Sequence, residues 1–385
     1  MKRRALTVFV TFVVASGLVV GVPARAQTAG VTLKASRTTI TYGTAVVLSG
    51  KVTPQHPGEQ VQIVNEAGEV VAQALTDEQG RYSVRYAPAA ITTLRAQWLA
   101  ALSDPVEIQV KPRLRVKLRS VRLFSKSRIS GTIAPAHEGG RVTVRLHLNG
   151  RPVRERKVVL RKGLRFSLAM HIARPGRYRA TASFDDDDHL KARKPSRAVS
   201  TPTPSLSPGA RGRYVHLLEQ RLRRLGYHIT GVNERYDYRT SDAVIAFHKV
   251  QSMERVGTVS PASWRALANP RKPRPRGGKS WHIEIDQTKQ VIYTVRKGRV
   301  ENILHTSTGA GGATRDGTFH VTRKLAGYSG GGLYYPSYFD GLRAIHGWEE
   351  VPTYPASHGC ARVPMWAAQW IYGLADIGTE VLIYH

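Results

Sequence analysis

The sequence predicts a multidomain, mainly β protein, and three observations support this fold class. Short runs of alternating apolar and polar residues fill residues 31–200 and return after residue 280, which is the pattern of half-buried strands. Residues 201–270 change instead to the spacing of helices. The chain has 385 residues, which is more than a single hydrophobic core usually organises.

Residues 1–26 have the pattern of a secretory signal peptide. Residues 2–4 are basic, residues 5–22 are mostly apolar, and Ala24 and Ala26 are small residues at the positions that a signal peptidase reads. An uncleaved membrane anchor is the alternative, because the apolar run nearly has the length of a bilayer span. We expect cleavage, no stable membrane span in the mature chain, and a location outside the cytoplasm, in the cell wall or the periplasm.

The first two β segments are expected to form tandem β-sandwich repeats of the immunoglobulin-like kind. Leu-Ser-Gly at 48–50 recurs as Ile-Ser-Gly at 129–131, an offset of 81, and Arg-Tyr-Ser at 81–83 recurs as Arg-Phe-Ser at 165–167, an offset of 84. A three-residue insertion is therefore expected in a turn of the second repeat. Its acidic run should be a loop, because it lacks the spacing of a calcium-binding loop. The expected boundaries are 27–112 for the first repeat and 113–200 for the second.

Positive charge is concentrated in the second repeat. The formal net charge of the chain is +31, and residues 113–200 carry 23 basic and 6 acidic side chains, whereas residues 281–385 carry 9 of each. This surface either keeps the protein soluble or attracts polyanions such as anionic wall polymers. Export and the lack of a nucleic-acid-binding motif argue against nucleic acid as a partner. Arginines that alternate with apolar residues should face solvent, and they are Arg141, Arg145, Arg151, Arg154, Arg156 and Arg161.

Residues 201–270 predict a small module of three helices. Apolar residues recur at helical spacing in three stretches, which lie at 215–225, 240–250 and 261–267. The blocks G-x-x-G-x-x-V-x-x-L-x-x-x-L-x-x-L-G-Y, Y-D-x-x-T-x-x-A-V-x-x-F and S-W-R-A-L resemble, over residues 206–268, the peptidoglycan-binding domain that accompanies bacterial wall hydrolases and transpeptidases. Three aromatic residues of this module, Tyr227, Tyr236 and Trp264, are either ligand contacts or core residues.

A basic Pro/Gly linker at 271–280 precedes the last segment, residues 281–385. Alternation predicts a hairpin that turns at 287–289, and the Gly-rich residues 309–312 do not fit the spacing of a nucleotide-binding loop. These glycines are expected to allow a tight turn or a close approach of substrate to the backbone. Further elements are expected as strands at 303–307, 318–322 and 381–384 and as a helix at 365–374.

Cys360 is the only cysteine of the chain, so it cannot form an internal disulfide. A thiol with a pKa of about 8.5 is mostly protonated at neutral pH, and a histidine beside it favours the nucleophilic thiolate. His358 would share a face with Cys360 in an extended segment, and His346 lies upstream. Gly359 would let a carbonyl approach the backbone N–H groups of residues 359 and 360. The stretch indicates acyl transfer through a thioester, with a zinc site and an inert buried cysteine as alternatives.

Several motifs of the last segment occur in order: I-E-I-D near its start, S-T-G at 307–309, T-x-x-G-x-F at 314–319, I-H-G at 345–347 and S-H-G-C-x-R at 357–362. With these motifs, the segment resembles the L,D-transpeptidase catalytic domain of the YkuD family over its whole length. The resemblance implies that Cys360 is the nucleophile and that His346 is its general base, oriented by a backbone carbonyl. It also implies that His358 and Gly359 shape the oxyanion region and that Arg362 holds the loop or a substrate carboxylate. The further site residues that it suggests are Ser357 for catalysis and Gly347, Tyr335 and Thr314 for substrate binding.

The family resemblance implies crosslinking of peptidoglycan. The thiol would attack a tetrapeptide stem at the L-centre of diaminopimelate, expel D-alanine and pass the acyl group to an amine of a neighbouring stem. The expected partners are stem peptides and glycan strands, and no metal or cofactor is required. An L,D-carboxypeptidase that gives the same thioester to water, and a non-enzymatic scaffold that binds the wall, remain alternatives.

Overall fold

The computed structural model describes residues 29–385, so the predicted signal peptide lies outside the described residues. The chain divides into two compact units. Unit 1 comprises the described residues up to Arg113 together with Asp185–Ala192, and unit 2 comprises Leu114–Phe184 and Arg193–His385. No helix between residues 29 and 385 has the length and apolarity needed to cross a membrane. The architecture is mainly β and multidomain, which confirms the predicted fold class.

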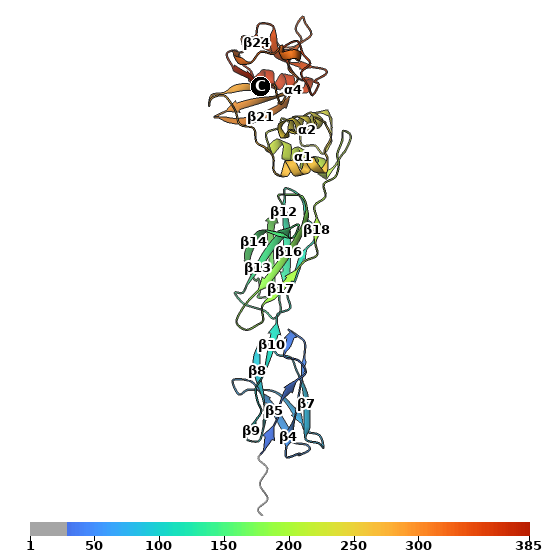
Figure 1. Ribbon diagram of the computed structural model, residues 1–385, viewed down its shortest axis with the longest axis vertical. Helices are drawn as coiled ribbons and strands as arrows, with labels where there is room; N and C mark the ends of the chain where they lie inside the picture. Colours follow the sequence, from blue (N-terminus) through green and yellow to red (C-terminus); the bar gives the residue numbers. More distant parts are fainter. Residues whose placement is uncertain (1–28) are drawn as a thin grey trace, which may run out of the picture. The chain divides into compact units, whose positions relative to one another are not determined.

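Unit 1 is built from two sheets whose inner faces form one core (Figure 1). Alternation along the strands buries one side of each sheet, and Leu48, Val61 and Ile108 are completely buried. The first sheet contains β1 (Gly30–Val31), β2 (Lys34–Ala35), β4 (Val46–Thr53) and β7 (Arg81–Tyr86). The second contains β3 (Thr39–Thr41), β5 (Gln60–Val64), β6 (Val70–Leu75), β8 (Thr92–Trp98), β9 (Ala101–Leu102) and β10 (Val106–Lys111).

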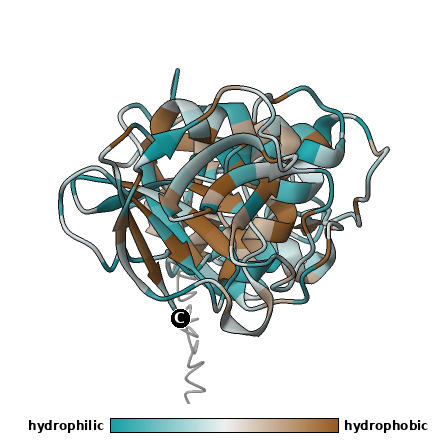
Figure 2. Cartoon of the chain, turned by 90° about the horizontal axis from the view of Figure 1, so that it is seen from above, coloured by the Kyte–Doolittle hydropathy of each residue, from teal (hydrophilic) through white to brown (hydrophobic). Residues whose placement is uncertain are grey.

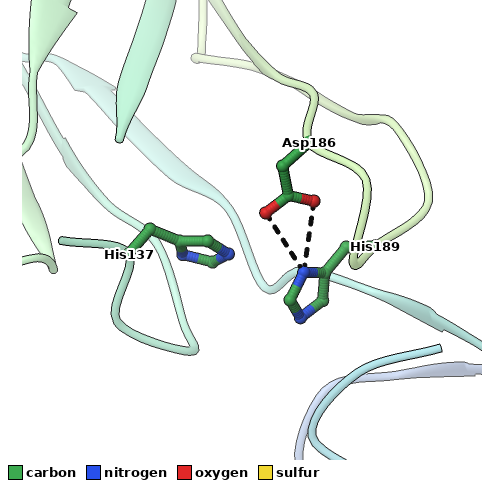
Figure 3. Close-up of side chains that lie close together, drawn as sticks. All are labelled: His137, Asp186 and His189. Carbon is green, nitrogen blue, oxygen red and sulfur yellow. Dashed lines mark hydrogen bonds and ion pairs between the residues drawn. The ribbon is translucent and has the colours of Figure 1, made fainter. Parts of the chain in front are cut away.

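The acidic run of the second repeat lies in a loop, as predicted, and this loop belongs to unit 1. Figure 3 shows Asp186 and His189 facing each other, with His189 Nδ1 3.2 Å from both carboxylate oxygens. The other ring nitrogen, Nε2, lies 2.8 Å from the carbonyl oxygen of Ala89. The backbone N–H of Leu190 donates to the carbonyl of Val110 at 2.8 Å. These hydrogen bonds hold the loop against the first repeat.

The second repeat, in unit 2, has the same two-sheet design. Its first sheet contains β11 (Arg115–Leu118), β12 (Lys126–Thr132) and β15 (Arg165–His171). Its second sheet contains β13 (Arg141–Leu148), β14 (Arg151–Val159), β16 (Arg177–Phe184), β17 (Ala192–Pro195) and β18 (Val199–Ser200).

Equivalent glycines mark the two repeats in the structure. Gly50 pairs with Tyr82 across β4 and β7, and Gly131 pairs with Phe166 across β12 and β15. A Cβ at position 131 would lie 2.2 Å from Phe166 Cζ, and one at position 50 would lie 2.6 Å from the Tyr82 hydroxyl. The aromatic ring therefore packs directly over the glycine in both repeats, which explains why the two triplets found in the sequence end in glycine.

The three-residue insertion lies in the hairpin of β13 and β14, where the strands and not the turn are longer, so the expectation that it lies in a turn is wrong. Strand β6 has 6 residues, whereas its counterpart β14 has 9 and pairs with β13 apart from a bulge at Val153. Because β14 is an edge strand, every residue in it except Val158 is exposed. The arginines of this hairpin face solvent, as the alternation predicted.

Residues 201–270 fold into the three expected helices, α1 (Arg213–Arg224), α2 (Tyr238–Gln251) and α3 (Pro261–Ala268). Helix α3 begins with a capping box in which Ser260 and Ser263 each bond the other's backbone N–H. The three aromatic residues that the sequence left open are buried: Tyr227 is 3% exposed, Tyr236 2% and Trp264 1%. They are core residues, which decides the choice that the sequence left open.

The C-terminal segment contains two sheets and one helix. The first sheet has the order β21 (Arg299–His305), β20 (Val291–Arg296), β19 (His282–Asp286), β27 (Glu380–Tyr384), β22 (Gly317–His320). The second has the order β23 (Arg323–Lys324), β24 (Tyr334–Asp340), β25 (Arg343–Trp348), β26 (Ala361–Pro364). A short 3₁₀ helix η1 (Ala310–Gly312) lies in the Gly-rich loop, and helix α4 (Met365–Leu374) packs on β24 and β25. In Figure 2 the apolar stretches of strand and helix, in brown, lie among hydrophilic loops.

The helical module and the C-terminal segment share one apolar core. Tyr227 and Phe247 from the module pack in the same cluster as Val291, Tyr293 and Ile303 from β20 and β21. Burial of this kind is worth about 1.5–3 kcal/mol for each large apolar side chain. The helical module is therefore part of the body that carries the cysteine.

Candidate active site

The register of two parallel strands brings the cysteine and one histidine together. His346 on β25 pairs with Arg362 on β26, and Cys360 directly precedes β26. Side chains two residues apart on a strand share a face, and paired residues of parallel strands also share a face. His346, Arg362 and Cys360 therefore lie on one side of this sheet.

The imidazole of His346 is held in one tautomer. Its Nδ1 donates to the carbonyl oxygen of Gly347 at 2.9 Å, which leaves Nε2 as the nitrogen that can accept a proton. This is the orienting carbonyl that the family resemblance implied. The ring is 2% exposed and meets Trp348 edge-on at 5.5 Å between centroids. Burial lowers the pKa of His346, and the charge of Arg362 lowers it further, so the ring is neutral at pH 7.

The thiol of Cys360 is partly buried, and burial raises its pKa, while the backbone N–H of Ala344 and the charges of Arg362 and Arg343 act in the opposite direction. The thiol donates to the carbonyl oxygen of Leu342 at 3.8 Å. Both the thiol of Cys360 and the imidazole of His346 are therefore neutral at pH 7. A general base, rather than a preformed ion pair, suits these two groups.

A bend at Gly359 replaces the extended segment that the sequence suggested, so the argument that His358 and Cys360 share a strand face is wrong. Gly359 has φ 126°, a region that favours glycine, and a Cβ there would lie 2.7 Å from Arg343 Nε. Its backbone N–H donates to Ser357 Oγ at 3.0 Å, and this hydroxyl donates to the carbonyl of Cys360 at 2.6 Å. The N–H of Gly359 is thus occupied, and of the two expected oxyanion donors the N–H of Cys360 remains.

Thr314 holds this bend from the Gly-rich loop. Its hydroxyl donates to the carbonyl of Gly359 at 2.9 Å and accepts from the backbone N–H of Gly309 at 2.8 Å. The loop also pairs with the cysteine segment directly, because the N–H of Ala310 donates to the carbonyl of Ser357 at 2.8 Å. The S-T-G and T-x-x-G-x-F motifs therefore meet at the cysteine, although they are far from it in the chain.

The remaining predicted residues pack against helix α4 or face solvent. Gly347 faces helix α4, where a Cβ would lie 2.7 Å from Ala368 Cβ. Tyr335 packs edge-on against Tyr372 of α4 at 5.1 Å between centroids. His358 is exposed. Gly347 thus serves close packing, and its carbonyl is its contact with His346.

Arg343 is a site residue that the sequence did not single out. Its Nε donates to the carbonyl of Ala313 at 2.9 Å, and its Nη1 donates to Asp340 at 2.9 Å. Hydrogen bonds and the charge of Arg315 and Arg343 lower the pKa of Asp340, so this carboxylate remains charged. Arg343 thereby links the Gly-rich loop to the cysteine bend. Its signal in the sequence is weak, a basic residue shortly before the I-H-G motif.

Lys249 is a second residue that the sequence did not reveal. It lies on helix α2 with 2% of its surface exposed. Its Nζ donates to the carbonyls of Gln290 at 2.9 Å and Thr306 at 2.8 Å, and lies 2.7 Å from His305 Nδ1. A helical lysine usually faces solvent, so only the tertiary structure identifies this one.

The partners of Lys249 lead directly to the site. His305 Nε2 donates to the carbonyl of Val351 at 2.8 Å, in the loop that joins the predicted base to the cysteine. The hydroxyl of Thr306 donates to the carbonyl of Arg362 at 2.6 Å, and the next residue pairs with Arg362 through both backbone groups. The helical module therefore supports both the loop and the strand that flank Cys360.

A family model described as the L,D-transpeptidase catalytic domain, YkuD, matches residues 280–383. A crystallised L,D-transpeptidase from Xylanimonas cellulosilytica is 37% identical, and the match covers 48% of this chain and 99% of that one with a TM-score of 0.46. On the family match, residues 280–383 form an L,D-transpeptidase catalytic domain of the YkuD family, which supports an enzyme of that class.

Two further structures are more distant. An L,D-transpeptidase from Stackebrandtia nassauensis is 22% identical over 48% of this chain and 97% of its own, with a TM-score of 0.31. A mutant L,D-transpeptidase from Enterococcus faecium is 23% identical over 27% of this chain and 49% of its own, with a TM-score of 0.25. A comparison with curated proteins gave no match.

Proposed function

We propose that this protein crosslinks peptidoglycan stem peptides as a cysteine-dependent L,D-transpeptidase. The observation that carries the proposal is the register of β25 and β26, which sets His346 and Cys360 on one face of the sheet. The hydrogen bond from His346 Nδ1 to a backbone carbonyl supports a role for Nε2 as the base.

In the acylation step, Cys360 Sγ attacks the carbonyl carbon at the L-centre of diaminopimelate while His346 Nε2 accepts the thiol proton. The C–S bond forms, the C–N bond to D-alanine breaks, and the departing amine takes the proton from His346. In the second step, a side-chain amine of a neighbouring stem attacks the carbonyl carbon of the thioester, so that a new C–N bond forms and the C–S bond breaks. Its proton passes to His346 and then to the sulfur, which restores the thiol. The two steps balance without a metal or a cofactor.

The negative oxygen that forms in each step needs donors in fixed positions. The N–H of Cys360 is the donor that we assign, because the N–H of Gly359 is bonded to Ser357. The bend fixed by Thr314 aims this donor. We assign His358, exposed beside the bend, to contact with the incoming stem, and Arg362 to ordering of the strand edge.

The upstream segments are proposed to bring the site to its substrate. The motif blocks of residues 206–268 support binding of glycan strands by the helical module, and the pattern of residues 1–26 supports export to the cell wall or periplasm. Because Tyr227, Tyr236 and Trp264 are buried, a ligand of the module would meet its exposed side chains, among them Tyr238.

The test is incubation of the purified protein with muropeptides that bear tetrapeptide stems, followed by mass analysis. We expect dimers that have lost one D-alanine, and no such products from the Cys360→Ala variant. Trimmed monomers alone would indicate the L,D-carboxypeptidase. Equal products from the variant and the wild type would refute catalysis by this thiol and favour a non-enzymatic scaffold that binds the wall. A carbapenem should add mass to the peptide that contains Cys360, and an unmodified peptide would count against a reactive thiol.

A further inference from the structure

An arginine-lined cavity lies on the second sheet of the basic repeat, in a part of the molecule that the proposed reaction does not use. Its volume is about 650 Å³, and three of its lining residues are Arg177, Arg179 and Arg193. No aspartate or glutamate lines this cavity. The remaining lining residues are His147, Asn149, Gly150, Thr181, Pro195 and Ala198.

The strand register explains why the basic groups converge. His147 on β13 pairs with Arg179 on β16, and Arg177 lies two residues away on the same face of β16. Strand β17, next to β16 in the sheet, carries Arg193. The hairpin turn closes one end, because Asn149 Oδ1 accepts from the backbone N–H of Arg177 at 2.9 Å. The cavity is thus formed by regular secondary structure.

The positive charge in this cavity is not neutralised within the described residues. Within the described residues, 29–385, the strands of this sheet carry one ion pair, which joins Arg145 and Glu155. These two residues do not line the cavity. Nδ1 of His147, at the same cavity, is buried and has no hydrogen-bond partner among the described residues. Three guanidinium groups that converge without a counter-charge repel one another, and a bound anion would remove that repulsion.

The chemistry of the lining selects phosphate. A guanidinium group offers two parallel N–H donors that match two oxygens of a phosphate, and a threonine hydroxyl and an asparagine amide add neutral donors at the same cavity. We propose that this cavity binds phosphate groups of a phosphodiester-linked polymer. A flat bilayer does not enter a recess, and the lining has no large apolar side chain that would insert into lipid.

The test measures binding of glycerol phosphate oligomers to the full chain by calorimetry at several salt concentrations. The double variant Arg179→Gln/Arg193→Gln removes two charges from the cavity. Its matched control, Arg154→Gln/Arg156→Gln, removes two charges from exposed positions on β14 that do not line the cavity. All four side chains are exposed, so neither variant should disturb folding.

We expect the cavity variant to bind at least tenfold more weakly than the wild type and the control to stay within about twofold. The slope of log affinity against log salt should fall by roughly 1.5 to 2 in the cavity variant, because two phosphate contacts are lost. Equal weakening in both variants would show diffuse attraction and overturn the cavity. Equal or tighter binding to phosphatidylglycerol vesicles would assign the site to a membrane, and absence of binding would refute the proposal. Crosslinking of muropeptides is measured separately and should be the same in both variants.

Discussion

Replacement of Lys249 by methionine tests whether the helical module supports the active site. Methionine keeps the length of the side chain and removes the ammonium group. The charge of Lys249 follows from counting donors. His305 Nε2 donates to a carbonyl, and burial lowers the pKa of this histidine to about 3, so its Nδ1 is an acceptor. Lys249 must then donate to three acceptors, which only the ammonium form can do, although burial lowers its pKa.

The expected cost follows from the two acceptors that lose their donor, His305 Nδ1 and the carbonyl of Thr306, since the carbonyl of Gln290 keeps the backbone N–H of Thr306 at 3.2 Å. Each buried acceptor without a partner costs about 1–3 kcal/mol. For these two acceptors the total is about 2–6 kcal/mol, a range that includes the cost of about 3–5 kcal/mol for removing one member of a buried charged pair. Because two of the partners, His305 and Thr306, are bonded to the loop and strand beside the cysteine, crosslinking activity should fall by roughly 10- to 100-fold.

Urea unfolding and muropeptide crosslinking should be measured on Lys249→Met and on Lys272→Met. Lys272 lies exposed in the linker and serves as the matched control, with an expected change within about 0.5 kcal/mol. The pH profile of the residual activity separates a positioning role from simple instability. A misplaced base in the folded protein changes both the rate and the pH profile, whereas partial unfolding lowers the rate and leaves the profile unchanged. If the two variants unfold alike and retain equal activity, the helical module does not support the site through Lys249.

Three further predictions concern the thiol, the base and the sandwich. Burial lowers the pKa of His346, so the kcat/KM for crosslinking should be flat around pH 7, with its acid limb below about pH 6.5. Burial raises the pKa of Cys360, so alkylation by iodoacetamide should accelerate only above about pH 8.5. An acid limb above pH 7 would contradict the general-base assignment. His346→Ala should lower kcat by about 10²- to 10⁴-fold and His358→Ala by less than about tenfold, and the reverse order would exchange their roles. Gly50→Ala, whose Cβ would lie 1.8 Å from a backbone oxygen, should destabilise the protein by about 1–3 kcal/mol, whereas Gly30→Ala, with nothing within 4 Å, should leave the unfolding midpoint unchanged.

Patterns short enough to be local were readable in the sequence. Alternation located the strands, the 81-residue offset identified the repeats, and helical spacing placed α4 at its observed bounds, Met365–Leu374. The motifs around Cys360 and His346 were also readable, because each of them spans only a few consecutive residues. The insertion in the second repeat was misplaced, since a longer hairpin and a longer turn have the same sequence offset.

What the tertiary structure alone decided are contacts between residues that are distant in the chain. The bend at Gly359 depends on Thr314 and Arg343, and it takes away an oxyanion donor that an extended strand would have offered. The burial of Lys249 depends on strands that begin 40 or so residues later, and the convergence of Arg177 with Arg193 depends on the order of strands in a sheet. Periodicity and motif spacing fix which face of an element is apolar and which residues can react. Strand order and packing fix which of those faces meet, and no local pattern carries that information.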